Sequence, residues 1–184
     1  MKKIFSYLFI ISIIGFVLSC KKKEEADKLT EFDINYSTNL SIPSASIAVN
    51  SQTTVVEFTT PNIPTQQSTK FSAEGTAKNL ISEIKITKFD ISAVGTGANL
   101  NYLKSLTIYV KASNVGEQLV ASKTSIPTGI TSISMDLQDV NIKNYIFEDN
   151  IQFRVVATFD ATASTADQTL KMDETVHVKA TLLK

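Results

Sequence analysis

The chain has 184 residues and balances 18 lysines and arginines against 18 aspartates and glutamates, so its formal net charge is zero. That balance leaves no basic field for nucleic acid, and Arg154, the single arginine, cannot form the forked pairs that recognise phosphate groups. With one cysteine the chain cannot form an internal disulfide, and its length is that of one ordinary domain with a short extension.

The first twenty residues have the parts of a secretory signal. Lys2 and Lys3 form a positive start, and a mostly apolar run follows from Ile4 to Leu18. The run has about 15 residues, fewer than the ~20 that a helix needs to cross a bilayer. The segment therefore predicts export, with cleavage after the small residue Ser19.

The sequence Val17-Leu18-Ser19-Cys20 resembles the lipobox of bacterial lipoproteins. The resemblance implies cleavage between Ser19 and Cys20, attachment of diacylglycerol to the Cys20 thiol, and acylation of the new terminus. Two or three lipid chains anchor a protein firmly, so the implied partner is a membrane. The alternative is a signal-anchor helix with an incidental cysteine, which would leave a lone thiol in an exported protein.

The charged run after Cys20 predicts a flexible tether over residues 20–30. Within it, Lys23, Glu24 and Glu25 resemble the export signals of some Gram-negative surface lipoproteins. The expected organisation is a signal peptide over 1–19, a lipidated tether over 20–30 and one domain over 31–184. The expected location is the cell envelope, at the outer membrane. The periplasmic face and the surface-exposed face are both left as alternatives.

From residue 31 onward apolar and polar residues alternate, which is the period of strands that bury one face. The alternating runs are 32–36, 47–49, 55–58, 80–94, 106–112, 119–121, 133–137, 153–159 and 170–182. Residues 139–146 alone have helical spacing. The pattern predicts an all-β fold, an antiparallel β-sandwich of the Ig-like or jelly-roll type with eight or nine strands and one short helix.

Two segments of this pattern carry more specific expectations. Residues 61–78 are mostly polar and are predicted to form the longest loop. In the run 80–94 the apolar phase slips by one residue between Ile86 and Phe89. A slip of this kind indicates a β-bulge or a strand that passes from one sheet to the other.

The sequence supplies little of the usual chemistry of enzymes, so no catalytic residue, cofactor or metal site is predicted. Cys20 is taken by lipid, and the single histidine, His177, falls on the outward face of a predicted strand. A zinc site needs three or four ligands of this kind. Calcium stays open as an alternative, because acidic residues lie in several turns and in the last strand: Glu148, Asp149, Asp160, Asp167, Asp173 and Glu174.

Three tyrosines are candidates for stacking against a ligand: Tyr102, Tyr109 and Tyr145. Tyr109 lies on the polar face of the strand 106–112, so it is the candidate ligand-binding residue. A structural role for an exposed strand tyrosine is the alternative. The chain has no tryptophan, which sites for sugars often use as a platform.

These observations predict a membrane-anchored envelope lipoprotein whose β-sandwich binds or supports a partner without catalysis, the partner being an envelope protein or a glycan. Two other classes remain as alternatives, a small carbohydrate-active or other hydrolytic enzyme and an accessory subunit of an outer-membrane complex. An exposed apolar patch would favour a protein partner. A pocket with two close carboxylates would favour the enzyme.

Overall fold

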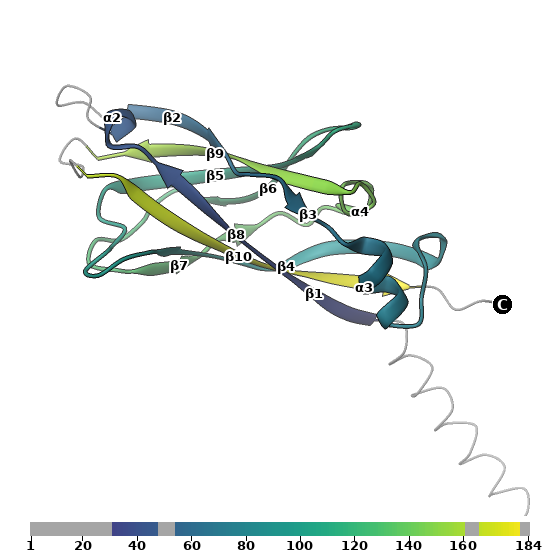
Figure 1. Ribbon diagram of the computed structural model, residues 1–184. Coiled ribbons are helices and arrows are strands. Elements are labelled where there is room, and N and C mark those ends of the chain that lie inside the picture. The colour runs from purple at the N-terminus through teal and green to yellow at the C-terminus, as the bar shows by residue number, and fades with distance from the viewer. Residues whose placement is uncertain (1–30, 48–53, 161–165, 181–184) are drawn as a thin grey trace, which may run out of the picture.

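The structure is a computed structural model that describes residues 31–47, 54–160 and 166–180 (Figure 1). Ten strands in these residues form two antiparallel sheets that pack face to face. The predicted all-β sandwich is confirmed, with more strands than the eight or nine expected. Several additional strands are two or three residues long, too short to show a period in the sequence.

Sheet A has four strands in the order β1-β10-β4-β7. Their bounds are β1 Glu31–Ile42, β4 Ile81–Ala93, β7 Ser132–Ser134 and β10 Gln168–Ala180. β1 is an edge strand that pairs with β10 along its whole length, from Glu31 opposite Lys179 to Ile42 opposite Gln168. The first and last described strands are therefore neighbours.

Sheet B has six strands. Five of them follow the order β2-β9-β5-β6-β8, and β3 also pairs with β9. Their bounds are β2 Thr54–Thr59, β3 Ile63–Pro64, β5 Leu103–Ala112, β6 Val115–Lys123, β8 Asp136–Leu137 and β9 Asn150–Phe159. Inward residues of the two sheets interlock, as where the rings of Phe89 and Phe153 meet edge to face at 5.2 Å between centroids.

The slip predicted in the run 80–94 is a β-bulge in β4. Thr175 of β10 lies opposite Lys88 and the next residue, Val176, lies opposite Ile86, so Thr87 is the extra residue. The Thr87 hydroxyl donates to the carbonyl oxygen of Thr175 at 3.3 Å. The bulge lets β4 remain in sheet A while its apolar residues change phase along the chain.

The helices differ from the prediction. They are α2 Ser44–Ile47, α3 Gln67–Ala73, the 3-10 helix η1 Lys78–Leu80 and α4 Lys143–Ile146. The helix predicted over 139–146 is found at that place, but it is shorter than predicted. The other three helical segments were not predicted. The run 47–49 is not a strand at Ile47, which ends α2, while 48–53 lie outside the described residues. The segment 61–78 is not a loop, because β3 and α3 lie within it.

Helix α3 is held by tertiary packing rather than by strong local signals. Gln66 precedes it in a left-handed conformation, with φ of 50°, and makes no side-chain cap. Phe71 is 1% exposed and meets the rings of Phe32 and Phe147 edge to face. One buried aromatic residue thus docks a seven-residue helix that has a weak helical signal of its own.

The sandwich has two distinct ends (Figure 1). One end, which we call the base, is where β1 begins at Glu31 and β10 ends at Ala180, with α3 nearby. The tip is the opposite end, where Ile42 lies opposite Gln168. At ~3.3 Å per residue the twelve paired residues of β1 separate base from tip by roughly 35–40 Å. Among the described residues, no helix is both long enough and apolar enough to cross a bilayer.

Candidate functional site

The predicted lipidation site lies outside the described residues. This holds for the signal peptide over 1–19, for Ser19 and Cys20 at the cleavage site, and for the tether over 20–30. The acylated cysteine and the membrane as its partner therefore stay predictions. What the structure adds is the position of Glu31, the first described residue after the predicted tether, at the base of the sandwich.

The predicted ligand-binding residue, Tyr109, lies on the outer face of sheet B with an arginine across its ring. The Arg154 guanidinium carbon is 4.2 Å from the ring centroid, and the two residues are paired across β5 and β9. Arg154 Nε donates to both carboxylate oxygens of Glu117, at 3.0 and 2.9 Å, and a 3.2 Å ion pair joins Arg154 to Glu57. One face of Tyr109 is therefore occupied, and its ligand-binding role stays a prediction.

Replacing Arg154 by lysine tests whether this arrangement matters. Lysine has neither the planar fork for Glu117 nor a flat group to lie on Tyr109. We expect Arg154→Lys to lower the free energy of unfolding by about 1 kcal/mol in urea titrations. Lys104→Met, which removes a single exposed ion pair to Asp160, should change it by less than about 0.5 kcal/mol. An Arg154→Lys protein as stable as wild type would contradict the account.

The other two candidate tyrosines are core residues. Tyr102 is 4% exposed and stacks on Phe159 with ring centroids 6.2 Å apart. Burial raises the pKa of the Tyr102 phenol, and its hydroxyl has no hydrogen-bond partner in the described part of the chain. The Tyr145 hydroxyl donates to the carbonyl oxygen of Gly116 at 2.6 Å. Neither ring is open for stacking against a ligand.

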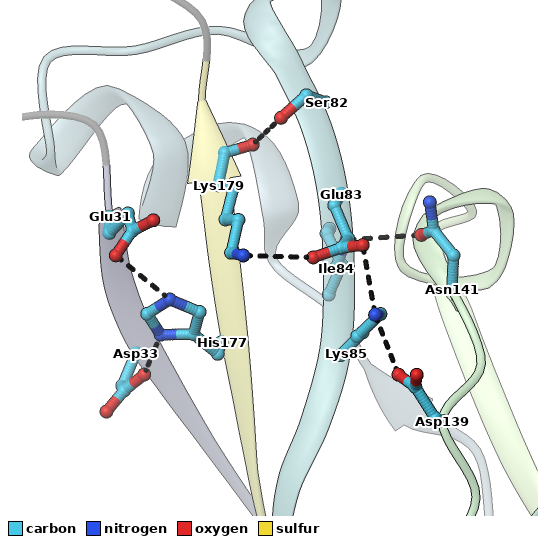
Figure 2. A network of polar contacts seen from close by, with 10 residues as sticks. All are labelled: Glu31, Asp33, Ser82, Glu83, Ile84, Lys85, Asp139, Asn141, His177 and Lys179. Atoms are coloured by element: carbon cyan, nitrogen blue, oxygen red, sulfur yellow. Dashed lines mark hydrogen bonds and ion pairs between the residues drawn. The ribbon is translucent and has the colours of Figure 1, made fainter.

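His177 belongs to a network of polar contacts on the outer face of sheet A near the base (Figure 2). Its Nδ1 is 2.8 Å from Oδ1 of Asp33, and its Nε2 is 3.5 Å from a Glu31 oxygen. The expected outward position is confirmed, but the ring is held between two carboxylates of β1. No group of three or more histidine, cysteine or acidic residues in the described part of the chain is arranged to hold a metal ion.

A second group of polar contacts lies beside it on β10 and β4 and extends to the segment before α4 (Figure 2). Glu83 pairs with Lys179 at 3.4 Å and with Lys85 at 3.1 Å, and Lys85 reaches Asp139 at 2.7 Å. The hydrogen bond from Lys85 lowers the pKa of the Glu83 carboxyl, and Lys179 adds to the effect. Asn141 accepts a backbone hydrogen bond from Ile84 at 3.1 Å. These contacts join neighbouring strands and hold the residues before α4 against sheet A.

A polar cleft of about 600 Å³ opens at the tip. We call it the tip cleft, and its lining comes from the β4–β5 connection and the start of β10: Val94, Gly95, Thr96, Gly97, Ala98, Asn99, Asn101, Tyr102, Asp167 and Gln168. Gly95 and Gly97 have φ of 126° and 71°, in the region that favours glycine. Amides, a hydroxyl and bare backbone therefore form most of the walls.

Two hydrogen bonds hold the walls of the tip cleft. The backbone N–H of Gly129 donates to Oδ1 of Asn101 at 2.6 Å. The backbone N–H of Ser44 donates to Oδ1 of Asp167 at 2.7 Å, and the bonds from Ser44 lower the pKa of that carboxyl. Among the described residues that line the cleft, Asp167 is the one carboxylate. The described lining thus does not show the two close carboxylates that glycoside hydrolysis uses.

The exposed apolar surface of the described residues is small. Val55 and Val94 are the large hydrophobic residues exposed there, at 62% and 46%. Isolated residues of this kind are normal on soluble proteins. The feature that would have favoured an apolar protein partner is therefore not seen in the described residues.

Sequence reasoning missed the buried acid of the core, Glu174. It points inward from β10 and is 2% exposed, and neither carboxyl oxygen has a hydrogen-bond partner in the described part of the chain. Burial, together with the charge of Asp173, raises its pKa to about 8. The signal was present in the sequence, because Glu174 shares the alternation of Met172 and Val176, which are buried.

Comparison with known proteins identifies no family for this chain. No protein-family model matches it, and a search of curated proteins finds no match. Among solved structures it is similar to a chain of Desmodium yellow mottle tymovirus, with 14% identity, 84% of each chain covered and a TM-score of 0.30. It is also similar to a chain of turnip yellow mosaic virus, with 12% identity, 84% of this chain and 97% of that chain covered, and a TM-score of 0.28. Scores this low carry no argument about the fold or the function.

Proposed function

We propose that this chain is a lipid-anchored protein of the bacterial cell envelope whose β-sandwich is a non-catalytic binding module. The lipobox-like residues before Cys20 support the anchor. The observation that carries the binding role is the position of the tip cleft, at the end of sheet A opposite to Glu31. A module tethered through residues 20–30 would hold this cleft roughly 35–40 Å from Glu31, where the predicted tether joins the sandwich.

The lining of the tip cleft favours an uncharged ligand rich in hydroxyl groups, such as an envelope glycan. Asn99, Thr96 and the glycine backbone offer donors and acceptors without net charge. The Asp167 carboxylate already accepts the Ser44 N–H. An apolar partner would find little surface to bury in such a cleft.

The absence of catalysis is proposed on the chemistry of the two strongest candidate acids. Asp167 has no second carboxylate beside it in the lining of the tip cleft. Glu174 has the raised pKa of a general acid, but both of its oxygens are enclosed between the sheets. A general acid must come within hydrogen-bond reach of its substrate, and Glu174 does not meet that condition in this conformation.

Blocking the tip cleft tests the binding role. Thr96 is exposed on the β4–β5 connection, so Thr96→Arg should fill the mouth of the cleft without disturbing the core. We expect wild type to be retarded in native gels that contain a neutral polysaccharide, either dextran, a soluble β-glucan or galactomannan. Thr96→Arg should lower the affinity measured from this retardation at least about tenfold, which is equivalent to about 1.4 kcal/mol of binding free energy.

The matched control places the same new side chain at the base. Ala77 is exposed before η1, and Ala77→Arg should bind as wild type does. Loss of binding in both variants would indicate a charge effect rather than a site. Retardation of wild type by none of the three polysaccharides would contradict the choice of a glycan ligand.

A further inference from the structure

Glu174 is a carboxyl group enclosed by aromatic side chains. In the register of sheet A it lies between Tyr36 of β1 and Phe89 of β4, which are 6% and 1% exposed. The Tyr36 hydroxyl does not donate a hydrogen bond to Glu174, because it donates to the carbonyl oxygen of Thr65 at 3.0 Å. An ionised carboxylate without a partner is strongly disfavoured in such a place, so Glu174 is neutral in this conformation.

Few titratable groups act on Glu174 from the elements around it. On its own strand, the charge of Asp173 on the opposite face raises its pKa. On β1, Tyr36 is a neutral phenol whose own pKa is raised by burial and by Glu174. β4 places Phe89 on the inner side, with Lys88 and Asp90 paired to each other on the outer side at 2.8 Å. Helix α3 supplies Lys70, whose positive charge lowers the pKa of Glu174.

Lys70 holds α3 against the free edge of β1. Its ammonium nitrogen is 3.7 Å from the centroid of the Tyr36 ring and 3.5 Å from the carbonyl oxygen of Asn35. Burial lowers the pKa of Lys70, and the attraction of Glu174 partly offsets that effect. Tyr36 is therefore the shared neighbour of both groups. An open pocket of about 330 Å³ lies beside Lys70, between β1 and α3.

We propose that Glu174 and Lys70 form a proton-linked switch that controls how α3 seats against the edge of β1. With Glu174 neutral, Lys70 lies on the Tyr36 ring and bonds to the Asn35 carbonyl, as the structure has it. When Glu174 releases its proton to solvent, the buried carboxylate needs a cation, and Lys70 leaves Asn35 to pair with it. The edge of β1 at Asn35 then loses its cover, and α3 loses a contact that holds it.

Hydrogen exchange on the full-length protein, purified in detergent, tests the switch. Exchange of residues 31–38 and 67–76 is followed at pH 6.5 and pH 9 and corrected for the intrinsic effect of pH. We expect protection of both segments in wild type to fall at least about tenfold between the two values. Glu174→Gln, which cannot ionise, should change less than about twofold. Glu74→Gln, the same replacement at an exposed position next to α3, should behave as wild type does.

A second variant keeps the test decisive if Glu174→Gln does not fold. Lys70→Met removes the cation but leaves a long apolar side chain over Tyr36. Because Lys70→Met has no ammonium group to leave Asn35, protection of both segments should change less than about twofold between pH 6.5 and pH 9. An equal fall in protection in wild type and Glu174→Gln would overturn the proposal, and so would a fall of the wild-type size in Lys70→Met. A pH-dependent change confined to other segments would overturn it as well.

Discussion

Raising the pH from 5 to 8 is expected to lower the free energy of unfolding of the wild-type protein by roughly 2–4 kcal/mol through Glu174 alone. The pKa of this carboxyl is about 8 in the fold and 4.5 in its ordinary surroundings. Between these values the folded chain holds a proton that the unfolded chain has lost. The stabilisation is thus complete below about pH 4.5 and disappears as the pH rises through 8.

The contribution of Glu174 is isolated by comparison with Glu174→Gln in urea titrations from pH 5 to pH 9. At pH 5 the two proteins should agree within about 1 kcal/mol, because the neutral acid and the amide are similar in size and polarity. At pH 8 the variant should be the more stable by roughly 2–4 kcal/mol. Other carboxyl groups titrate in both proteins, so their effects cancel in the difference. A difference that stays constant from pH 5 to pH 9 would contradict the burial of a neutral Glu174.

Truncating Phe71 is expected to cost about 3 kcal/mol of unfolding free energy, the lower end of the range for buried phenylalanine. The ring is 1% exposed and packs on Phe32 and Phe147, so Phe71→Ala leaves a cavity between α3 and the rest of the base. The helix makes no side-chain cap at Gln66 and is too short to persist without that contact.

Ser72→Ala is the control for Phe71→Ala, since Ser72 is exposed on the same helix and should change stability by less than about 0.5 kcal/mol. Hydrogen exchange of residues 67–76 should rise in Phe71→Ala and remain unchanged in Ser72→Ala. A loss below about 1 kcal/mol in urea titrations of Phe71→Ala would mean that α3 is not part of the cooperative core.

The strands could be predicted from the sequence because burial on one face leaves a direct trace in residue type. Leu170, Met172 and Val176 alternate along β10 as their burial requires, and the phase slip in β4 marked a real bulge at Thr87. The same periodicity placed Glu174 on the buried face. Its residue type pointed to solvent, and it is one of the acidic residues that left calcium open as an alternative. A conflict between period and residue type was therefore the signal of the buried acid.

Helix α3 and the tip cleft had no comparable trace. The segment 61–78 is polar apart from a few residues, and its helix exists because Phe71 finds a pocket built by residues far away in the chain. The tip cleft joins Thr96 and Asn99 of one connection to Asp167 at the end of another. Proximity of this kind depends on sheet order, which alternation does not encode.

Base and tip divide the proposed roles between them. The base carries the chain entry at Glu31 and the network around His177, together with α3 and its link to Glu174. The tip carries the polar cleft. The proposed membrane anchor at one end and the proposed ligand site at the other fit a module that presents a binding surface away from a membrane.

Metabolic labelling with an alkyne-bearing fatty acid tests whether the chain carries lipid at Cys20. Cells expressing wild type and Cys20→Ala are grown with the label, and the protein is captured, coupled to a fluorophore and examined on a gel. We expect a labelled wild-type band in the membrane fraction and no label on Cys20→Ala. Label of equal intensity on Cys20→Ala, or an unlabelled wild-type protein, would contradict attachment of lipid at Cys20.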